Sequence, residues 1–175
     1  MAIDNPFIVL LGKSGSGKTT IANILESEYG FKQVQSYTER PKRTEDETGH
    51  TFVTPEEFNK IENIIAYTQY GRYRYCTTKE QVESCDVAVL DVRGVNELRE
   101  RYDGEKNIVV FYLNVDHGIR KYRMRKRGDS PEAIAARIQY EIDVFAGAQD
   151  VCDYTLVNKK AKDAAHIINM TVRGY

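Results

Sequence analysis

The stretch "GKSGSGKTT", residues 12–20, constrains the fold of this chain more than any other part of it. It follows the apolar run "FIVLL", leads into a helical pattern, and fits the pattern G-x-x-x-x-G-K-[ST]. Glycines in such a loop let successive backbone N–H groups point at one phosphate, and the dipole of the following helix favours the same negative charge. The stretch therefore predicts a strand, a phosphate-binding loop and a helix, in that order.

The chemistry of this loop indicates a nucleoside triphosphate. We expect Lys18 to reach the transferred phosphate and the hydroxyl of Thr19 to bind Mg²⁺. Asp91 ends the run "VAVLD", where open α/β sheets bind ligands; it either holds Mg²⁺ through water or merely ends a strand. The loop residues assigned to the triphosphate are Gly12, Lys13, Ser14, Gly15, Ser16, Gly17, Lys18, Thr19 and Thr20.

Apolar runs alternate with helical patterns along most of the chain. The runs occupy residues 7–11, 86–92, 107–115 and 154–158, and the helical patterns occupy residues 18–29, 95–101, 117–127, 131–146 and 162–172. This alternation predicts an α/β fold with a parallel sheet covered on both faces. In the fourth helix, Ser130 and Pro131 mark the start, and an apolar stripe is expected at Ile134, Ile138, Ile142 and Phe145.

Residues 36–85 interrupt this rhythm. They contain the short alternating runs "IAYTQY" and "YRYCT" on either side of Gly71, and a capping box from Thr54 to Glu57. We interpret them as a small β-rich insertion in a single domain of 175 residues, whose core comprises residues 1–35 and 86–175.

Composition narrows the class of protein. A formal net charge of −1 argues against nucleic-acid binding, because proteins that bind the phosphate backbone carry a basic excess. Cys76, Cys85 and Cys152 are too widely spaced to indicate a zinc site or a disulfide framework. No run approaches the length of a membrane span, and the N-terminus lacks the pattern of a signal peptide. We expect a cytoplasmic protein that binds neither membranes nor nucleic acid; its oligomeric state stays open.

A second anion site is predicted in "SYTERPKR", residues 36–43. Arg40 and Arg43, held apart by Pro41, can present planar forks to a phosphate, and Ser36 can add its hydroxyl. The alternative is a solvated loop whose cations pair with nearby acidic residues. A GTPase is disfavoured, because Ala161 in "VNKKAKD" occupies the position of the aspartate in N-K-x-D.

The chain resembles the guanylate kinase family over nearly its whole length. The family pattern S-x-T-x-R-x-x-R, followed by an acidic loop and F-V-[ST]-x-E-x-F, is matched by "SYTERPKR" and "GHTFVTPEEF". The resemblance implies a P-loop kinase core of three layers, with an acceptor-binding insertion and a helical lid. It also implies that Ser36, Arg40, Arg43 and Tyr73 surround the phosphate of a nucleoside monophosphate.

The stretch "RMRKRGDSPEAIAARI" is similar to the lid of that family. The match assigns Arg123, Arg127 and Arg137 to a lid of about residues 120–137, and it places Asn158 near the donor adenine. Taken without the resemblance, the cations of residues 120–127 also fit a solvated helix end.

The base-reading residues of the family are not matched. Ala66 or Ile65 stands opposite a glutamate, and "LDVRGV" lacks the segment that holds a second acidic residue. His50 replaces a phosphate-binding tyrosine, so it is assigned to the acceptor site. Thr77, with Thr68 and Gln69, is an uncharged candidate for contact with the base.

These observations predict an ATP-dependent, Mg²⁺-requiring kinase whose acceptor is a nucleoside monophosphate, with GMP or dGMP expected on family grounds. Its catalytic residues would be Lys18, Arg40, Arg127 and Arg137. Two alternatives stay open. One is a kinase for another mononucleotide or a ribose phosphate, and the other is a non-catalytic guanylate kinase-like module that binds phosphopeptides.

Overall fold

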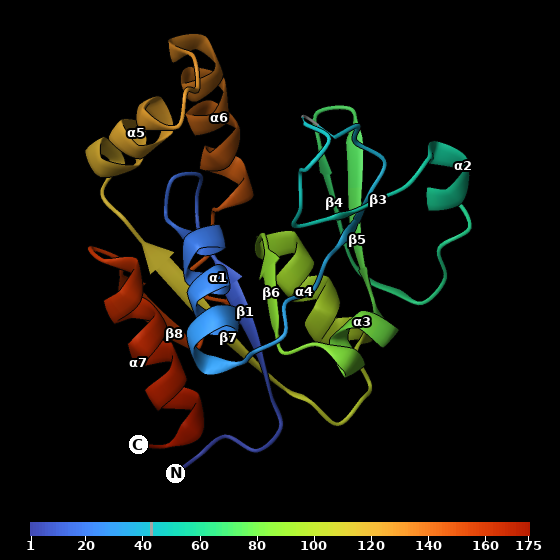
Figure 1. The fold of residues 1–175 in the computed structure, drawn as a ribbon, viewed down its shortest axis with the longest axis vertical. Helices are drawn as coiled ribbons and strands as arrows, with labels where there is room; N and C mark the ends of the chain where they lie inside the picture. The colour runs from blue at the N-terminus through green and yellow to red at the C-terminus, as the bar shows by residue number, and fades with distance from the viewer. Residues whose placement is uncertain (43) are drawn as a thin grey trace.

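A four-stranded parallel sheet forms the centre of the protein, whose computed structural model describes residues 1–42 and 44–175. The strand order is β6 (Val87–Leu90), β1 (Pro6–Leu11), β7 (Asn107–Asn114) and β8 (Tyr154–Val157). The predicted α/β class with a parallel sheet is thus confirmed. The carboxyl ends of these strands meet at one edge of the sheet, where the phosphate-binding loop leaves β1 (Figure 1).

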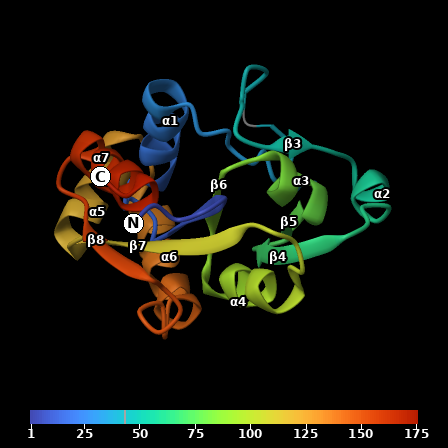
Figure 2. The same ribbon diagram turned by 90° about the horizontal axis from the view of Figure 1, so that it is seen from below.

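Helices cover both faces of this sheet, as Figure 2 shows. On one face Ile8 and Leu10 pack against α1 (Lys18–Tyr29) and α7 (Ala161–Arg173), whereas Phe7 and Val9 face the side of α4 (Val92–Arg101). Alternate residues of a strand point to opposite faces, so a strand that is covered on both sides must be apolar throughout. This explains why the run after Pro6 is continuously hydrophobic and fully buried.

A second, smaller sheet lies beside the first (Figure 1). Its order is β3 (Thr51–Phe52), β2 (Tyr37–Thr38), β5 (Tyr73–Thr78) and β4 (Ile64–Tyr70), and it carries α2 (Pro55–Phe58) and α3 (Lys79–Ser84). The backbone N–H of Tyr67 donates to Glu97 Oε2 at 2.7 Å, which ties β4 to α4 of the core. All of these elements fall within the residues that the sequence assigns to an insertion.

A helical hairpin of α5 (His117–Lys126) and α6 (Pro131–Val144) stands above the carboxyl edge of the parallel sheet (Figure 1). As expected, Ser130 caps α6 by accepting from the N–H of Ala133 at 3.1 Å, and Pro131 follows it. In the described part of the chain, no helix has the length and apolar character needed to cross a membrane.

The apolar stripe predicted for α6 is only partly correct. Ile134 is buried, but Ile142 is 55% exposed, and Glu141 takes the inward position with 5% exposure. The reason is that this part of α6 faces the phosphate-binding loop and α5, where Glu141 finds polar partners that an isoleucine could not satisfy.

Truncation of two isoleucines on the same helix tests this orientation of α6. Ile134→Ala should lower the free energy of unfolding by about 2–5 kcal/mol, because it leaves a cavity in a packed position. Ile142→Ala should change it by no more than about 0.5 kcal/mol, because the side chain is already exposed. Urea denaturation of both variants measures the difference, and equal losses would contradict the orientation.

Candidate active site

The loop between β1 and α1 forms a phosphate cradle. Gly15 and Gly17 have φ angles of 77° and 94°, a left-handed conformation that other residues rarely adopt. A Cβ atom on Gly17 would lie 2.4 Å from Asn158 Nδ2, so the close approach also requires glycine. The Lys18 ammonium donates to the carbonyls of Gly12 and Lys13. It is therefore held inside the loop at the start of the helix.

Lys18 lies in a cationic environment. The pKa of its ammonium is lowered to about 8, chiefly by desolvation; the carboxylate of Glu141 opposes this shift, and the nearby Arg127, Arg120 and Arg137 add to it. A lowered pKa means that the charged form is held at a cost, and a nearby anion would offset that cost. The loop thus presents a cation that favours a phosphate group.

The outward carbonyls of the loop are held by side chains from other elements. Arg123 donates to the carbonyls of Gly15 at 3.2 Å and Asn158 at 3.1 Å, and Asn158 Nδ2 donates to the carbonyl of Ser16 at 2.7 Å. Two buried atoms here, Ser16 Oγ and Asn158 Oδ1, have no hydrogen-bond partner among the described residues. Arg123 and Asn158, both predicted to bind ATP, thus contact the loop that would hold its phosphates.

The lid arginines face the same loop. Arg127 forms an ion pair with Asp129, and Arg137 lies with its guanidinium 3.4 Å from Ser14 Oγ and 5.3 Å from the ring centroid of Tyr70. A cavity of about 390 Å³ is lined by Ser14, Gly15, Gly17, Lys18, Thr19, Thr20, Arg123, Arg127 and Arg137. The structure therefore brings together most of the residues that the sequence assigns to the triphosphate.

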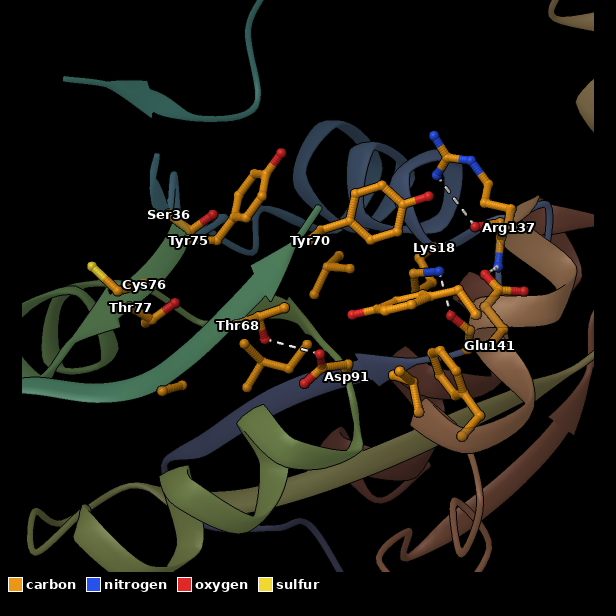
Figure 3. A pocket seen from close by; sticks show the side chains of 18 of the residues that line it. Lys18, Ser36, Thr68, Tyr70, Tyr75, Cys76, Thr77, Asp91, Arg137 and Glu141 are labelled. Atoms are coloured by element: carbon orange, nitrogen blue, oxygen red, sulfur yellow. Dashed lines mark hydrogen bonds between the residues drawn. The ribbon is translucent and has the colours of Figure 1, made fainter. Parts of the chain in front are cut away.

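A second cavity, of about 220 Å³, opens between the two sheets (Figure 3). Gly12 and Lys18 line one side of it, and the small sheet with the residue just before it supplies Thr77, Ser36 and other residues. Ser36 Oγ and His50 Nδ1 lie 2.9 Å apart, so these two predicted acceptor residues are hydrogen-bonded to each other. Lys18 lines both cavities, as do Ser14 and Arg137, so the two cavities adjoin at the phosphate-binding loop.

Arg40 lies in an adjoining cavity of about 680 Å³ that also contains Ser36 and His50. Arg40 is 8% exposed, and its guanidinium donates to both oxygens of Glu47, at 3.2 and 2.7 Å, which raises the pKa of Arg40. Its buried Nε has no hydrogen-bond partner among the described residues. A buried cation with an unused donor suits an anion. The other predicted arginine, Arg43, falls outside the described residues.

The structure does not place Tyr73 with the other acceptor residues. Tyr73 pairs with Tyr70 at the tip of the hairpin, where its hydroxyl accepts from Arg72. Tyr75 instead lines both acceptor-side cavities, because the register of β5 sets it opposite Thr38. Two tyrosines so close in sequence can be told apart only by that register, which the sequence pattern left open by one residue near Gly71.

Asp91 lies on the acceptor side of the site. Its Oδ1 accepts from the N–H of Gly94 at 2.7 Å, which starts α4 earlier than expected, and its Oδ2 accepts from the Thr68 hydroxyl at 2.9 Å (Figure 3). Thr19 lines the other two cavities, so the two predicted Mg²⁺ residues do not share one. Their joint role as metal ligands stays a prediction.

Sequence reasoning did not find Glu141, Tyr70 or Tyr140. Glu141 forms a buried ion pair with Arg120 at 3.1 Å. Tyr70 and Tyr140 meet edge to face with ring centroids 5.0 Å apart, and both line the acceptor cavity. Glu141 was hidden inside an apparent apolar stripe; the tyrosines come from distant segments, so no local pattern pairs them.

Comparisons with known proteins indicate the family to which the chain belongs. The AAA domain family model matches residues 8–143. The guanylate kinase of Salinibacter ruber is 30% identical over 171 residues, which cover 89% of this chain and 88% of the relative. That of Fusobacterium nucleatum is 26% identical over 170 residues, covering 90% of each chain.

Solved structures resemble the fold as well. The crystal structure of guanylate kinase from Anaplasma phagocytophilum aligns with a TM-score of 0.62 at 20% identity, covering 94% of this chain and 82% of that one. A sugar kinase from Janibacter sp. aligns with a TM-score of 0.54 at 16% identity, covering 94% and 92%. With a P-loop, an arginine-bearing lid and an acceptor cavity joined at Lys18, and with these relatives, the chain belongs to the guanylate kinase family of P-loop phosphotransferases.

Proposed function

We propose that this protein transfers the γ-phosphoryl group of ATP to the phosphate of a nucleoside monophosphate, with GMP or dGMP as the acceptor. One observation carries the proposal: Lys18 lines both the P-loop and lid cavity and the cavity that contains Ser36, His50 and Tyr75. An ammonium at that junction can neutralise charge on the group that passes between two phosphates. The guanylate kinases among its relatives support a guanine nucleotide.

The residues of this chain supply positioning and charge neutralisation. Phosphoryl transfer needs little proton chemistry from the protein, so its rate depends on alignment and on cations near the developing charge. Arg137 and Arg127 face the donor cavity, and Arg40 faces the acceptor side. Because Glu47 holds one edge of Arg40, that guanidinium is already oriented beside the cavity that it lines.

Thr19 suits the role of a Mg²⁺ ligand. It lines both the donor cavity and the Arg40 cavity, and Mg²⁺ in kinases is held by few protein oxygens together with substrate phosphates. When bound there, the ion would screen the charge of the phosphates. Asp91 would act on the acceptor side instead, through its hydrogen bond with Thr68.

The side of the acceptor cavity formed by β4 and β5, which we call the base wall, carries few ionised groups. Ala66 is buried and pairs with Thr77 across the two strands, and burial raises the pKa of the neighbouring Cys76 thiol to about 12, so it stays neutral. The Thr68 hydroxyl donates a hydrogen bond to Asp91, and its oxygen lone pairs therefore remain free to accept in the cavity. Such a wall can accept hydrogen bonds from the N–H edge of guanine. It discriminates against other bases less strongly than a carboxylate that a wrong base would leave buried and unpaired.

Replacement of Lys18 by Ala tests the phosphoryl-transfer mechanism. The variant should lose turnover by on the order of 10²–10³-fold, because it removes a cation that faces the transferred group. Circular dichroism should remain unchanged, since Lys18 bonds only to carbonyls of its own loop. Turnover within tenfold of wild type would exclude this role.

A pair of conservative arginine variants tests the acceptor site. Arg40→Lys keeps a charge but removes the planar fork, so the KM for the monophosphate should rise roughly 10- to 100-fold while ATP affinity is kept. Arg74→Lys is the matched control, because Arg74 also pairs with a glutamate in the small sheet but lines none of the described cavities. An equal rise in both variants would show that the effect is structural.

The base wall is tested by a substrate panel. The ratio kcat/KM should favour GMP or dGMP over AMP, UMP, CMP and dTMP by less than about 10⁴, because hydroxyl groups reject a wrong base weakly. Ribose phosphates serve as controls without a base. Selectivity above that value would show that another residue reads guanine, and a preference for a ribose phosphate would overturn the assigned acceptor.

A further inference from the structure

Every polar group of Ser14 in the P-loop is contacted by a charged side chain of the α5–α6 hairpin. Its backbone N–H donates to Glu141 Oε1 at 2.6 Å, and its carbonyl accepts from Arg120 at 3.3 Å. Its hydroxyl lies 3.4 Å from the guanidinium of Arg137. Figure 3 shows Glu141 and Arg137 on α6, both directed at the loop beside Lys18. Two helices that are distant in sequence from the P-loop thus hold a single residue of that loop.

Glu141 and Arg120 also form an ion pair, and both of its side chains are buried. Each side chain is 7% exposed, and Arg120 donates to Glu141 Oε2 at 3.1 Å. A buried ion pair seldom stabilises a fold more than apolar residues of similar size would, because both charges lose their hydration. Simple packing of α5 against α6 would therefore be served equally well by apolar residues. Apolar residues cannot, however, accept a hydrogen bond from the N–H of Ser14.

We propose that Glu141 is a positioning residue for the phosphate cradle. It acts through Ser14 and Arg120 and touches no substrate in this role. The same helix face carries Arg137 one turn earlier, so the contact that fixes the loop also sets the distance between the loop and that lid arginine. This inference rests on the proposed function of the site.

Loss of Glu141 should affect the two substrates differently. Ser14 lines the donor cavity and, with Glu141, also the cavity of about 220 Å³, but neither residue lines the Arg40 cavity, to which the acceptor phosphate is assigned. A loop displaced by a fraction of an ångström misaligns ATP before it affects the monophosphate. Loss of Glu141 should therefore weaken ATP binding and lower kcat while the KM for the monophosphate stays close to wild type.

Two variants test this. In the double variant R120M/E141M, apolar residues replace both charges, so the melting temperature should remain near wild type. Its Kd for ATP, measured by calorimetry, should rise on the order of tenfold, and kcat should fall. Glu141→Gln keeps one carbonyl oxygen for the N–H of Ser14 and should give an intermediate Kd.

Glu97→Gln is the matched control. Glu97 is also a buried carboxylate, 8% exposed, that accepts a backbone N–H and pairs with an arginine, but it holds β4 rather than the P-loop. Its loss should leave the Kd for ATP unchanged.

The outcomes separate this inference from the proposed function. Wild-type protein that binds no ATP would overturn both. Wild-type binding together with unchanged Kd and kcat in Glu141→Gln and in the double variant would overturn the positioning role alone. A double variant that fails to fold would also overturn it, because the pair would then be required for the fold itself.

Discussion

The concentration of positive charge around Lys18 is the constraint on which the rest of the structure depends. Its ammonium is desolvated and has Arg120, Arg127 and Arg137 as neighbours, and each of them disfavours its charged form. Like charges in a region of low polarity repel strongly. Glu141 offsets part of this repulsion, and the phosphates of the substrates would offset more. The cradle is therefore electrostatically unsatisfied by itself, which favours binding of a polyanion.

Such a cluster needs a rigid support, and the parallel sheet provides it. β1 is fully buried between helices on both faces, so the point where the loop begins cannot shift without disturbing the core. Arg123 and Asn158 then hold the outward carbonyls of the loop from α5 and from the end of β8. Glu141 on α6 also accepts from the N–H of Ser14, so the loop is fixed from several sides.

Local sequence patterns predicted the elements of the core well. The alternation of apolar runs with helical patterns depends on burial within each segment, which explains why α1 begins and ends at the predicted residues, Lys18 and Tyr29. Features that depend on contacts between segments were not predictable. The register of β5 decides that Tyr75 rather than Tyr73 reaches the acceptor side, and the packing of α5 on α6 decides that Glu141 points inward. Periodicity cannot distinguish an inward carboxylate with a partner from a break in an apolar stripe.

The hairpin tip of the small sheet contacts α6 beside the acceptor-side cavity, which Tyr70 and Tyr140 both line. The Tyr140 hydroxyl donates to the carbonyl of Gln69 at 3.0 Å, and the ring of Tyr140 meets that of Tyr70. Both rings are more than a third exposed, so the hydrogen bond and the ring pair together contribute only about 1–3 kcal/mol. The small sheet and the α5–α6 hairpin are therefore joined here by a weak contact, which can separate without unfolding of either sheet.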